Sequence, residues 1–318
     1  MTFRWLTLFL DFPAGSFDAG VAFWCEVTGT ALSPLRGAAG EFATLLPPDG
    51  DACLRVQRIA DGSGGCHLDL HLDPAAGTVD QAADRAVALG AVVRHASEGL
   101  VIMSSPGGFT FCLVRWHGES HGGSHGESTV PRPVVLDAGG PSRADQLCLD
   151  IPPDAFEREY SFWAALTGWG PRPKSGEFAR LDQPAQIPLR LLFQRRDSAG
   201  PLDLVSGHVD FACARRERLA PRHAACGARV LSVFPHWTTM ADPTGRLYCL
   251  TVREPETGRL TGAAGPSMDS SAGDSPVMSG AVAASRAGPR NTRDMPRPAA
   301  GSSSPQAAQA RAVTPLAR

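Results

Sequence analysis

The apolar positions of this chain change their spacing in a fixed order along the sequence. Between residues 5 and 11 they alternate, with Leu6, Leu8 and Leu10 on one face, which predicts a half-buried strand. Apolar side chains then recur at helical spacing over residues 17–27, and Gly29 follows where a helix end favours glycine. Short apolar runs at 42–46 and 53–59 predict further strands. The first sixty residues therefore predict a strand, a helix and two or three strands.

A second cycle of the same order begins at residue 67. Alternation over His67–Asp73 places three leucines on one face and turns His67, Asp69 and His71 to the other. A helix is predicted from Val79 to Leu89, ended by Gly90, and strands at 92–95, 100–104 and 109–115.

The two halves of the chain resemble each other. Gly40-Glu-Phe-Ala43 recurs as Gly176-Glu-Phe-Ala179, and His67-Leu-Asp-Leu70 is matched by His208-Val-Asp-Phe211. Phe23-Trp24 recurs as Phe162-Trp163, so both tryptophans are expected in the core. The nearly constant offset between the pairs indicates a tandem duplication with short insertions in loops.

Two local signals in the second copy concern its helices. Asp154 and Glu157 have the spacing of a capping box, which predicts a helix start at Asp154. Pro221 falls inside the helix predicted before Gly227 and is expected to shorten or kink it.

Low-complexity segments divide the chain into four parts. We predict a first domain at 1–116, a flexible linker at 117–142 rich in His, Gly and Ser, a second domain at 143–254 and a disordered tail at 255–318. His117, His121 and His125 in the linker form a weak metal-binding tract at most, because the glycines between them oppose a helix.

Composition narrows the classes of function. The formal net charge of −2 argues against a dedicated nucleic-acid binder. No apolar run approaches the length of a membrane span or a secretory signal, so we expect a cytoplasmic protein without membrane partners. The eight cysteines include no C-x-x-C pair and are expected to be reduced.

The doubled βαβββ pattern, with its H-L-D-L strand, L-G-A helix end and Pro-Gly turn before the last strand, resembles the vicinal oxygen chelate superfamily. Within it the chain is similar to glyoxalase-like domains and bleomycin resistance proteins. The resemblance implies an α+β fold of two tandem domains, each a pair of βαβββ modules forming a curved, partly open barrel around a small-molecule cleft. Enzymes of that superfamily hold a divalent metal there, while other members bind a ligand without metal.

The resemblance also implies where ligands of a metal would lie. His67 and His208 occupy a common histidine position, but Cys112 and Cys249 stand where a glutamate is usual. The first strand offers Trp5, Thr7 or Phe9 in one copy and Gln146 or Cys148 in the other. The candidate cleft residues are Gln57, His67, Asp69, Cys112, Gln194, His208, Asp210 and Cys249. The weak metal candidates among them are His67, Cys112, His208 and Cys249.

Other polar residues leave alternatives open. Asp69 beside His67, and Asp210 beside His208, could orient an imidazole for acid–base chemistry or satisfy backbone N–H groups in turns. Arg55 with Arg190, and Arg58 with Arg195, recur in both copies and could steer a carboxylate or phosphate, or lie on the surface.

We expect a small-molecule-binding protein whose clefts are lined by groups such as Trp5, Phe9 and Phe111, without the usual catalytic metal. The alternative is a metal-dependent lyase, isomerase or dioxygenase acting on an oxygenated metabolite. A scaffold that acts through its tail is a third hypothesis. The sequence is compatible with a monomer or a homodimer.

Overall fold

The computed structural model describes residues 2–117, 128–136, 139–198 and 204–260. The first half of the chain forms strands and helices in the predicted order. They are β1 (Phe3–Pro13), α1 (Phe17–Thr28), β2 (Ala31–Leu32), β3 (Phe42–Leu46), β4 (Leu54–Ile59), β5 (Gly65–Leu72), α2 (Val79–Ala88), β6 (Val92–Ser97), β7 (Leu100–Ser104) and β8 (Thr110–Arg115). Short 3₁₀ turns at Ala14–Ser16 and Pro74–Ala76 precede the two helices.

The second half repeats this order after a short strand, β9 (Val134–Val135). Its elements are β10 (Pro141–Ile151), α3 (Phe156–Thr167), β11 (Gly170–Pro171), β12 (Phe178–Asp182), β13 (Arg190–Arg195), β14 (Ser206–Cys213), α4 (Arg216–Ala225), β15 (Arg229–Val233), β16 (Trp237–Ala241) and β17 (Leu247–Thr251).

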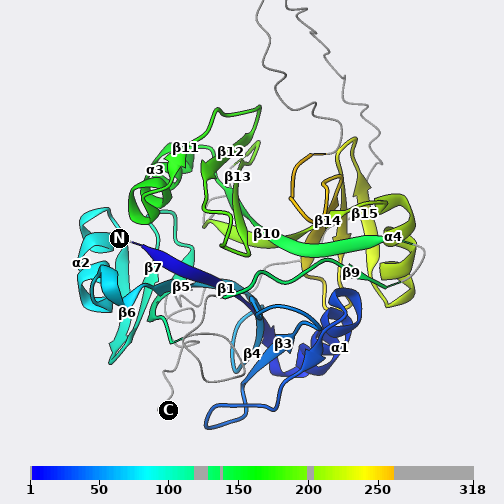
Figure 1. Cartoon of the computed structure of the whole chain (residues 1–318), viewed down its shortest axis with the longest axis horizontal. Coiled ribbons are helices and arrows are strands. Elements are labelled where there is room, and N and C mark those ends of the chain that lie inside the picture. The colour runs from blue at the N-terminus through cyan, green and yellow to red at the C-terminus, as the bar shows by residue number, and fades with distance from the viewer. Residues whose placement is uncertain (1, 118–127, 137–138, 199–203, 261–318) are drawn as a thin grey trace, which may run out of the picture.

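Each half forms one curved, unclosed sheet. The strand order is β2-β3-β4-β1-β5-β8-β7-β6 in the first and β11-β12-β13-β10-β14-β17-β16-β15 in the second. The central pair of each sheet, β1 with β5 and β10 with β14, is antiparallel and joins two βαβββ modules edge to edge. The predicted α+β fold of two tandem domains is confirmed (Figure 1).

Glycine ends the helices where the sequence predicts it. Gly29 and Gly168 follow α1 and α3 in the left-handed conformation, with φ of 64° and 73°. A side chain with a Cβ would be strained at both positions. Gly90 and Gly227, after α2 and α4, also have positive φ.

The structure tests two local predictions for the helices of the second copy. The capping box of Asp154 and Glu157 is wrong, because α3 begins at Phe156 with Ala155 as its N-cap and no side chain caps it. A turn at Pro152, in which Ala155 N–H donates to the Pro152 carbonyl, places the N-cap one residue later than predicted. Pro221 lies inside α4, which still continues to Ala225.

The two sheets share their first helices. Trp24 on α1 stacks on Phe211 of the second sheet at 6.0 Å, and its indole N–H donates to Asp242 at 2.9 Å. Reciprocally, Trp163 on α3 packs on Phe111 of the first sheet at 5.3 Å. Both tryptophans are fully buried, as predicted, and the buried apolar side chains of the two halves form one continuous core.

The chain between the sheets contacts both of them. β9 pairs with the start of β10, and Asp51 N–H of the first half donates to the Thr129 carbonyl. Two of the linker histidines, His121 and His125, lie outside the described residues, as does the tail from residue 261. Residues 254–260 are described and return to the second sheet, where Arg143 donates to the Glu256 carbonyl.

Two further features bear on the expectations from composition. Among the described helices none is long and apolar enough to cross a membrane. All eight cysteines are free thiols.

Replacing Glu159 with leucine should test how the shared helices stabilise the fold. The buried Glu159 carboxylate accepts the Gly107 backbone N–H at 2.7 Å and the Trp163 indole N–H at 2.8 Å. Leucine leaves both donors buried without a partner, so we expect the free energy of unfolding to fall by about 2–4 kcal/mol. Chemical denaturation measures the change. Glu157→Leu on the exposed face of α3 is the matched control, and an equal loss in both variants would contradict this account.

Candidate functional site

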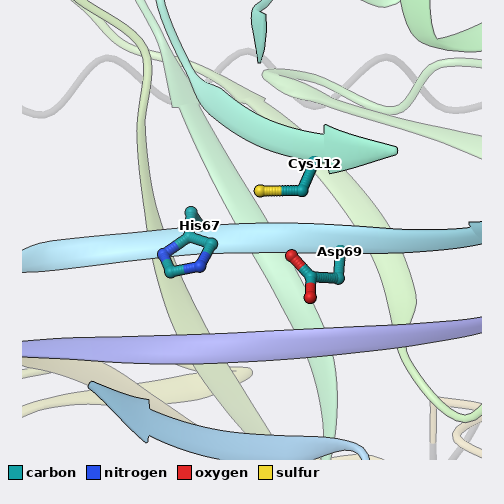
Figure 2. A group of neighbouring side chains, drawn as sticks. All are labelled: His67, Asp69 and Cys112. Carbon is teal, nitrogen blue, oxygen red and sulfur yellow. The ribbon is translucent and has the colours of Figure 1, made fainter. Parts of the chain in front are cut away.

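Strand alternation brings three of the predicted residues together in the first domain. His67 and Asp69 extend from one face of β5, while Leu68, Leu70 and Leu72 are buried on the other. Cys112 on β8 lies opposite Asp69 in the parallel pair, so its thiol joins the same group (Figure 2). One imidazole nitrogen, one carboxylate oxygen and the sulfur all lie within 4.8 Å of one another.

The His67 ring is held in place by two neighbours on β1. Its Nδ1 is 2.9 Å from Asp11 Oδ2, and its face stacks on Phe9 at 4.6 Å. Burial alone would lower the pKa of His67, but the charge and hydrogen bond of Asp11, together with the charge of Asp69, raise it above the ordinary histidine value. The hydrogen bond at Nδ1 leaves Nε2 as the nitrogen able to contact a ligand.

Asp11 is absent from the sequence-based candidates, although the duplication contains a signal for it. Asp11 lies in a Leu-Asp-Phe-Pro segment, and the second copy has Leu-Asp-Ile-Pro around Asp150. Asp150 makes the same bond, with its Oδ2 2.7 Å from His208 Nδ1. An acidic residue that recurs at the end of the first strand could have identified the partner of each histidine.

Burial disfavours the charged forms of the other two members of the group, Asp69 and Cys112. Burial raises the pKa of Asp69, and His67 and Arg55 oppose the rise. Burial, and then Asp69, raise the pKa of the Cys112 thiol well above its ordinary value. The Oδ1 atom of Asp69 is buried without a hydrogen-bond partner. A buried carboxylate oxygen of this kind has unused capacity to accept a hydrogen bond or a cation.

These side chains lie in the wall of a cavity of about 1090 Å³ in the first domain. Gln57 on β4, Phe42 on β3 and Leu100 on β7 line it as well. Phe9 lines it as expected, but the prediction for Phe111 is wrong. Phe111 precedes Cys112 on β8, so it points to the opposite face and packs on α3. Trp5 is fully buried and donates to the Ala52 carbonyl.

Two further predicted residues, His71 and Thr7, bond to each other. His71 bonds to Thr7 at 2.9 Å and packs on Trp116. Burial lowers the pKa of His71 to about 3, so it is neutral at physiological pH. Thr7 lies on β1 opposite Asp69.

The second domain contains a related group around His208. His208 Nε2 is 3.3 Å from Asp210 Oδ1 and 3.6 Å from Cys249 Sγ. Cys148 replaces Phe9 at the β10 position opposite His208, and its thiol donates to Gln194 at 3.7 Å. Burial lowers the pKa of His208, but Cys148 and the hydrogen bonds that His208 makes to two aspartates raise it to well above the ordinary value.

Gln146 and the thiols of Cys148 and Cys249 also belong to the group around His208. The Gln146 amide donates to Asp210 Oδ2 at 2.5 Å. Burial raises the pKa of Cys148 and of Cys249, so both thiols are protonated at neutral pH.

Aromatic side chains span the second cleft. Trp237 on β16 makes an edge contact with Phe178 on β12 at 5.8 Å, although four strands separate β12 from β16 in the sheet. The sheet must curve back on itself for these rings to meet. Phe234 stacks on Trp237 at 4.6 Å. Register places Leu100 of the first domain at the position of Trp237, and Phe42 at that of Phe178.

Residues 254–260 lie against the same domain. Arg190 on β13 pairs in register with Gln146 and donates to the Thr257 carbonyl. A Cβ at Gly258 would overlap the Arg190 side chain. Arg253 makes a two-pronged ion pair with the fully buried Asp145.

The donor types can be compared with the needs of a metal. An imidazole, a carboxylate and a thiol within 4.8 Å suit Zn²⁺, and a carboxylate that orients the histidine is a usual outer partner. The donor atoms of His67, Asp69 and Cys112 are therefore of the types that bind a divalent ion, provided that the thiol loses its proton. The second group fits in the same way through Cys148, His208 and Asp210.

Comparison with known proteins gives the family of both halves. The family model described as a glyoxalase-like domain matches residues 7–114 and 146–251. Among curated proteins none matches the chain.

Solved structures share the fold at low identity. The Mn(II)-bound glyoxalase from Novosphingobium aromaticivorans is 19% identical with a TM-score of 0.53, over 80% of this chain and 84% of that one. The 2,2',3-trihydroxybiphenyl 1,2-dioxygenase from Sphingomonas wittichii is 13% identical with a TM-score of 0.51, over 79% and 90%. A catechol 2,3-dioxygenase is 15% identical with a TM-score of 0.51, over 84% and 97%.

Replacing Asp11 with asparagine should lower the pKa of His67. The amide keeps the shape and an acceptor oxygen but removes the charge that stabilises the imidazolium, so His67 should lose its proton at lower pH than in the parent protein. A titration of the histidine ring signals by NMR measures this. Asp150→Asn should instead lower the pKa of His208. A His67 pKa that stays constant in Asp11→Asn would refute the assignment of Asp11 as the cause.

Proposed function

Because the chain belongs to the family of glyoxalase-like domains and contains two of them in tandem, we propose that it binds a small organic molecule in the cleft of its first domain. The binding does not require the metal of the related enzymes. The proposal keeps the two domains at 1–116 and 143–254. It assigns the cleft residues Gln57, His67, Asp69 and Cys112 to the ligand site.

The observation that supports this assignment is the contrast between the two clefts. The first contains a cavity of about 1090 Å³, slightly larger than most small-molecule sites. Leu100 and Phe42 both line it. In the second domain the equivalent residues, Trp237 and Phe178, touch each other and bridge the two walls. A ligand of ordinary size would have to break that aromatic contact to enter.

The metal-free version rests on the chemistry of the donors. The β1 residue in register with His67 is Phe9, which stacks on the imidazole ring and has no atom able to bind a metal. The thiol of Cys112 stands where the resemblance implies a glutamate, and burial opposes its ionisation. A metal would therefore have three protein donors, one of which must first lose a proton.

A metal-dependent lyase, isomerase or dioxygenase remains the second candidate. The buried Asp69 Oδ1 without a hydrogen-bond partner favours it. When bound, a divalent ion would polarise an oxygen of the substrate as a Lewis acid. In that case His67, Asp69 and Cys112 would hold it, and Asp11 would orient the imidazole.

A tryptophan that closes the first cleft should strongly weaken the binding of a small molecule there. Leu100→Trp copies the residue at the equivalent position of the second domain, where a tryptophan reaches Phe178. We expect the affinity for any ligand of this cleft to fall at least tenfold, with the thermal midpoint of the unliganded protein little changed. Fluorescence titration with an apolar dye, N-phenyl-1-naphthylamine, measures it. Val230→Trp on the exposed edge strand β15 is the control. Unchanged dye binding in Leu100→Trp would exclude the first cleft as the site.

Metal analysis separates the two candidates. Untagged, freshly purified protein should contain less than stoichiometric zinc, iron, manganese or nickel by plasma mass spectrometry. His67→Ala and His208→Ala test each group, and His236→Ala, an exposed histidine, is the control. One equivalent of metal that His67→Ala removes and His236→Ala retains would overturn the metal-free version and favour the enzyme.

A further inference from the structure

A row of side chains crosses the floor of the first cleft from β3 to β5. Backbone register places Thr44, Arg55, Phe9 and His67 side by side on four adjacent strands. The Arg55 guanidinium lies over the Phe9 ring at 5.7 Å, and the His67 ring stacks on Phe9 at 4.6 Å. Phe9 is therefore flanked by the Arg55 guanidinium on one side and the His67 imidazole on the other.

A second guanidinium lies at the β3 end of this row. Arg36 Nη2 donates to Thr44 Oγ1 at 2.9 Å, and Arg36 Nη1 donates to Ser33 Oγ at the same distance. These two bonds fix the Arg36 head next to the strand position that pairs with Arg55. Both arginines line the cavity.

The second domain lacks this arrangement. Leu192 occupies the register position of Arg55, and Cys148 that of Phe9. The sequence-based match of Arg55 with Arg190 is wrong, because Arg190 pairs with Gln146, two residues before Cys148. Arg58 and Arg195 do hold equivalent positions, but Arg58 lies over Phe17. Arg55 thus distinguishes the first cleft from the second.

The acidic groups of the cavity are unevenly distributed. Asp69 lies on β5 two residues after His67, and its carboxylate interacts electrostatically with His67 and Arg55. Asp11 is already bonded to His67. Among the described residues that line the cavity, the other acidic ones are Asp80 at the start of α2 and Glu98 in the turn between β6 and β7. Arg36 and Arg55 line the side of β3 and β4, where Asp69 interacts electrostatically with Arg55.

We propose that the ligand of the first cleft is an aromatic anion, a carboxylate or sulfonate whose charged group contacts Arg55 and Arg36 and whose ring packs on Phe9 and Phe42. This inference rests on the proposed function and specifies its ligand class. Arginine suits such a group because its planar fork donates two parallel hydrogen bonds to carboxylate-like oxygens.

The aromatic part of the proposal follows from the two phenylalanines. Phe9 and Phe42 meet edge to face at 6.1 Å, and both line the cavity. Such a pair presents an apolar corner of ring faces and edges, on which another ring packs favourably.

Two dyes with the same ring system test the charge requirement. 8-Anilinonaphthalene-1-sulfonate is an aromatic anion, and N-phenyl-1-naphthylamine is its neutral counterpart. We expect the parent protein to bind the sulfonate more tightly. Arg55→Leu, which introduces the residue found in the second domain, should raise the Kd of the sulfonate at least tenfold and change that of the neutral dye less than twofold. Arg195→Leu, an exposed arginine, should change neither.

The outcomes separate a failure of the anion inference from a failure of the proposed small-molecule binding on which it rests. Leu100→Trp should remove the signal of both dyes, which identifies the binding as that of the first cleft. If Leu100→Trp removes it but Arg55→Leu affects both dyes equally or neither, the anion inference is overturned and the proposed function stands. If neither dye binds the parent protein, or Leu100→Trp leaves both signals intact, the proposed function fails as well.

Discussion

The packing of each first helix on the opposite sheet is the interaction on which the rest of this structure depends. Trp24 and Trp163 bury their rings against Phe211 and Phe111, and each indole N–H has an acidic acceptor, Asp242 or Glu159. A buried indole without such an acceptor would destabilise the fold. With both satisfied, the convex faces of the two sheets form one core, so the concave faces are held in shape without help from a ligand.

The concave faces have diverged while the shared core has kept its pattern. In both copies an aspartate at the end of the first strand bonds to the histidine of the central strand. Around that pair the first copy has Phe9, Arg55 and Leu100, and the second has Cys148, Leu192 and Trp237. The first set lines a large cavity, and the second set brings aromatic rings together across the cleft. The same scaffold thus carries two clefts of different shape.

The sequence was sufficient for the fold because alternation and helix-ending glycines are local signals that recur in both copies. The positions of His67, Asp69 and Cys112 on one face follow from the same alternation. The cleft-lining assignment of Phe111 failed because it ignored that rule for the residue beside Cys112. The capping box at Asp154 failed because a turn at Pro152 moved the helix start. The contact of Trp237 with Phe178 depends on the curvature of a whole sheet, which no short sequence pattern encodes.

The shared helices also constrain how such a chain could have arisen and how it can be divided. A single half, separated from its sister, would expose the ring of Trp24 or of Trp163 together with the sheet surface that receives the other. A gene for one copy could therefore yield a stable product as a dimer that exchanges these contacts between two molecules, and fusion would make that exchange internal. Thereafter the residues of the two clefts could diverge, because the packing between the halves depends on the other faces of the sheets.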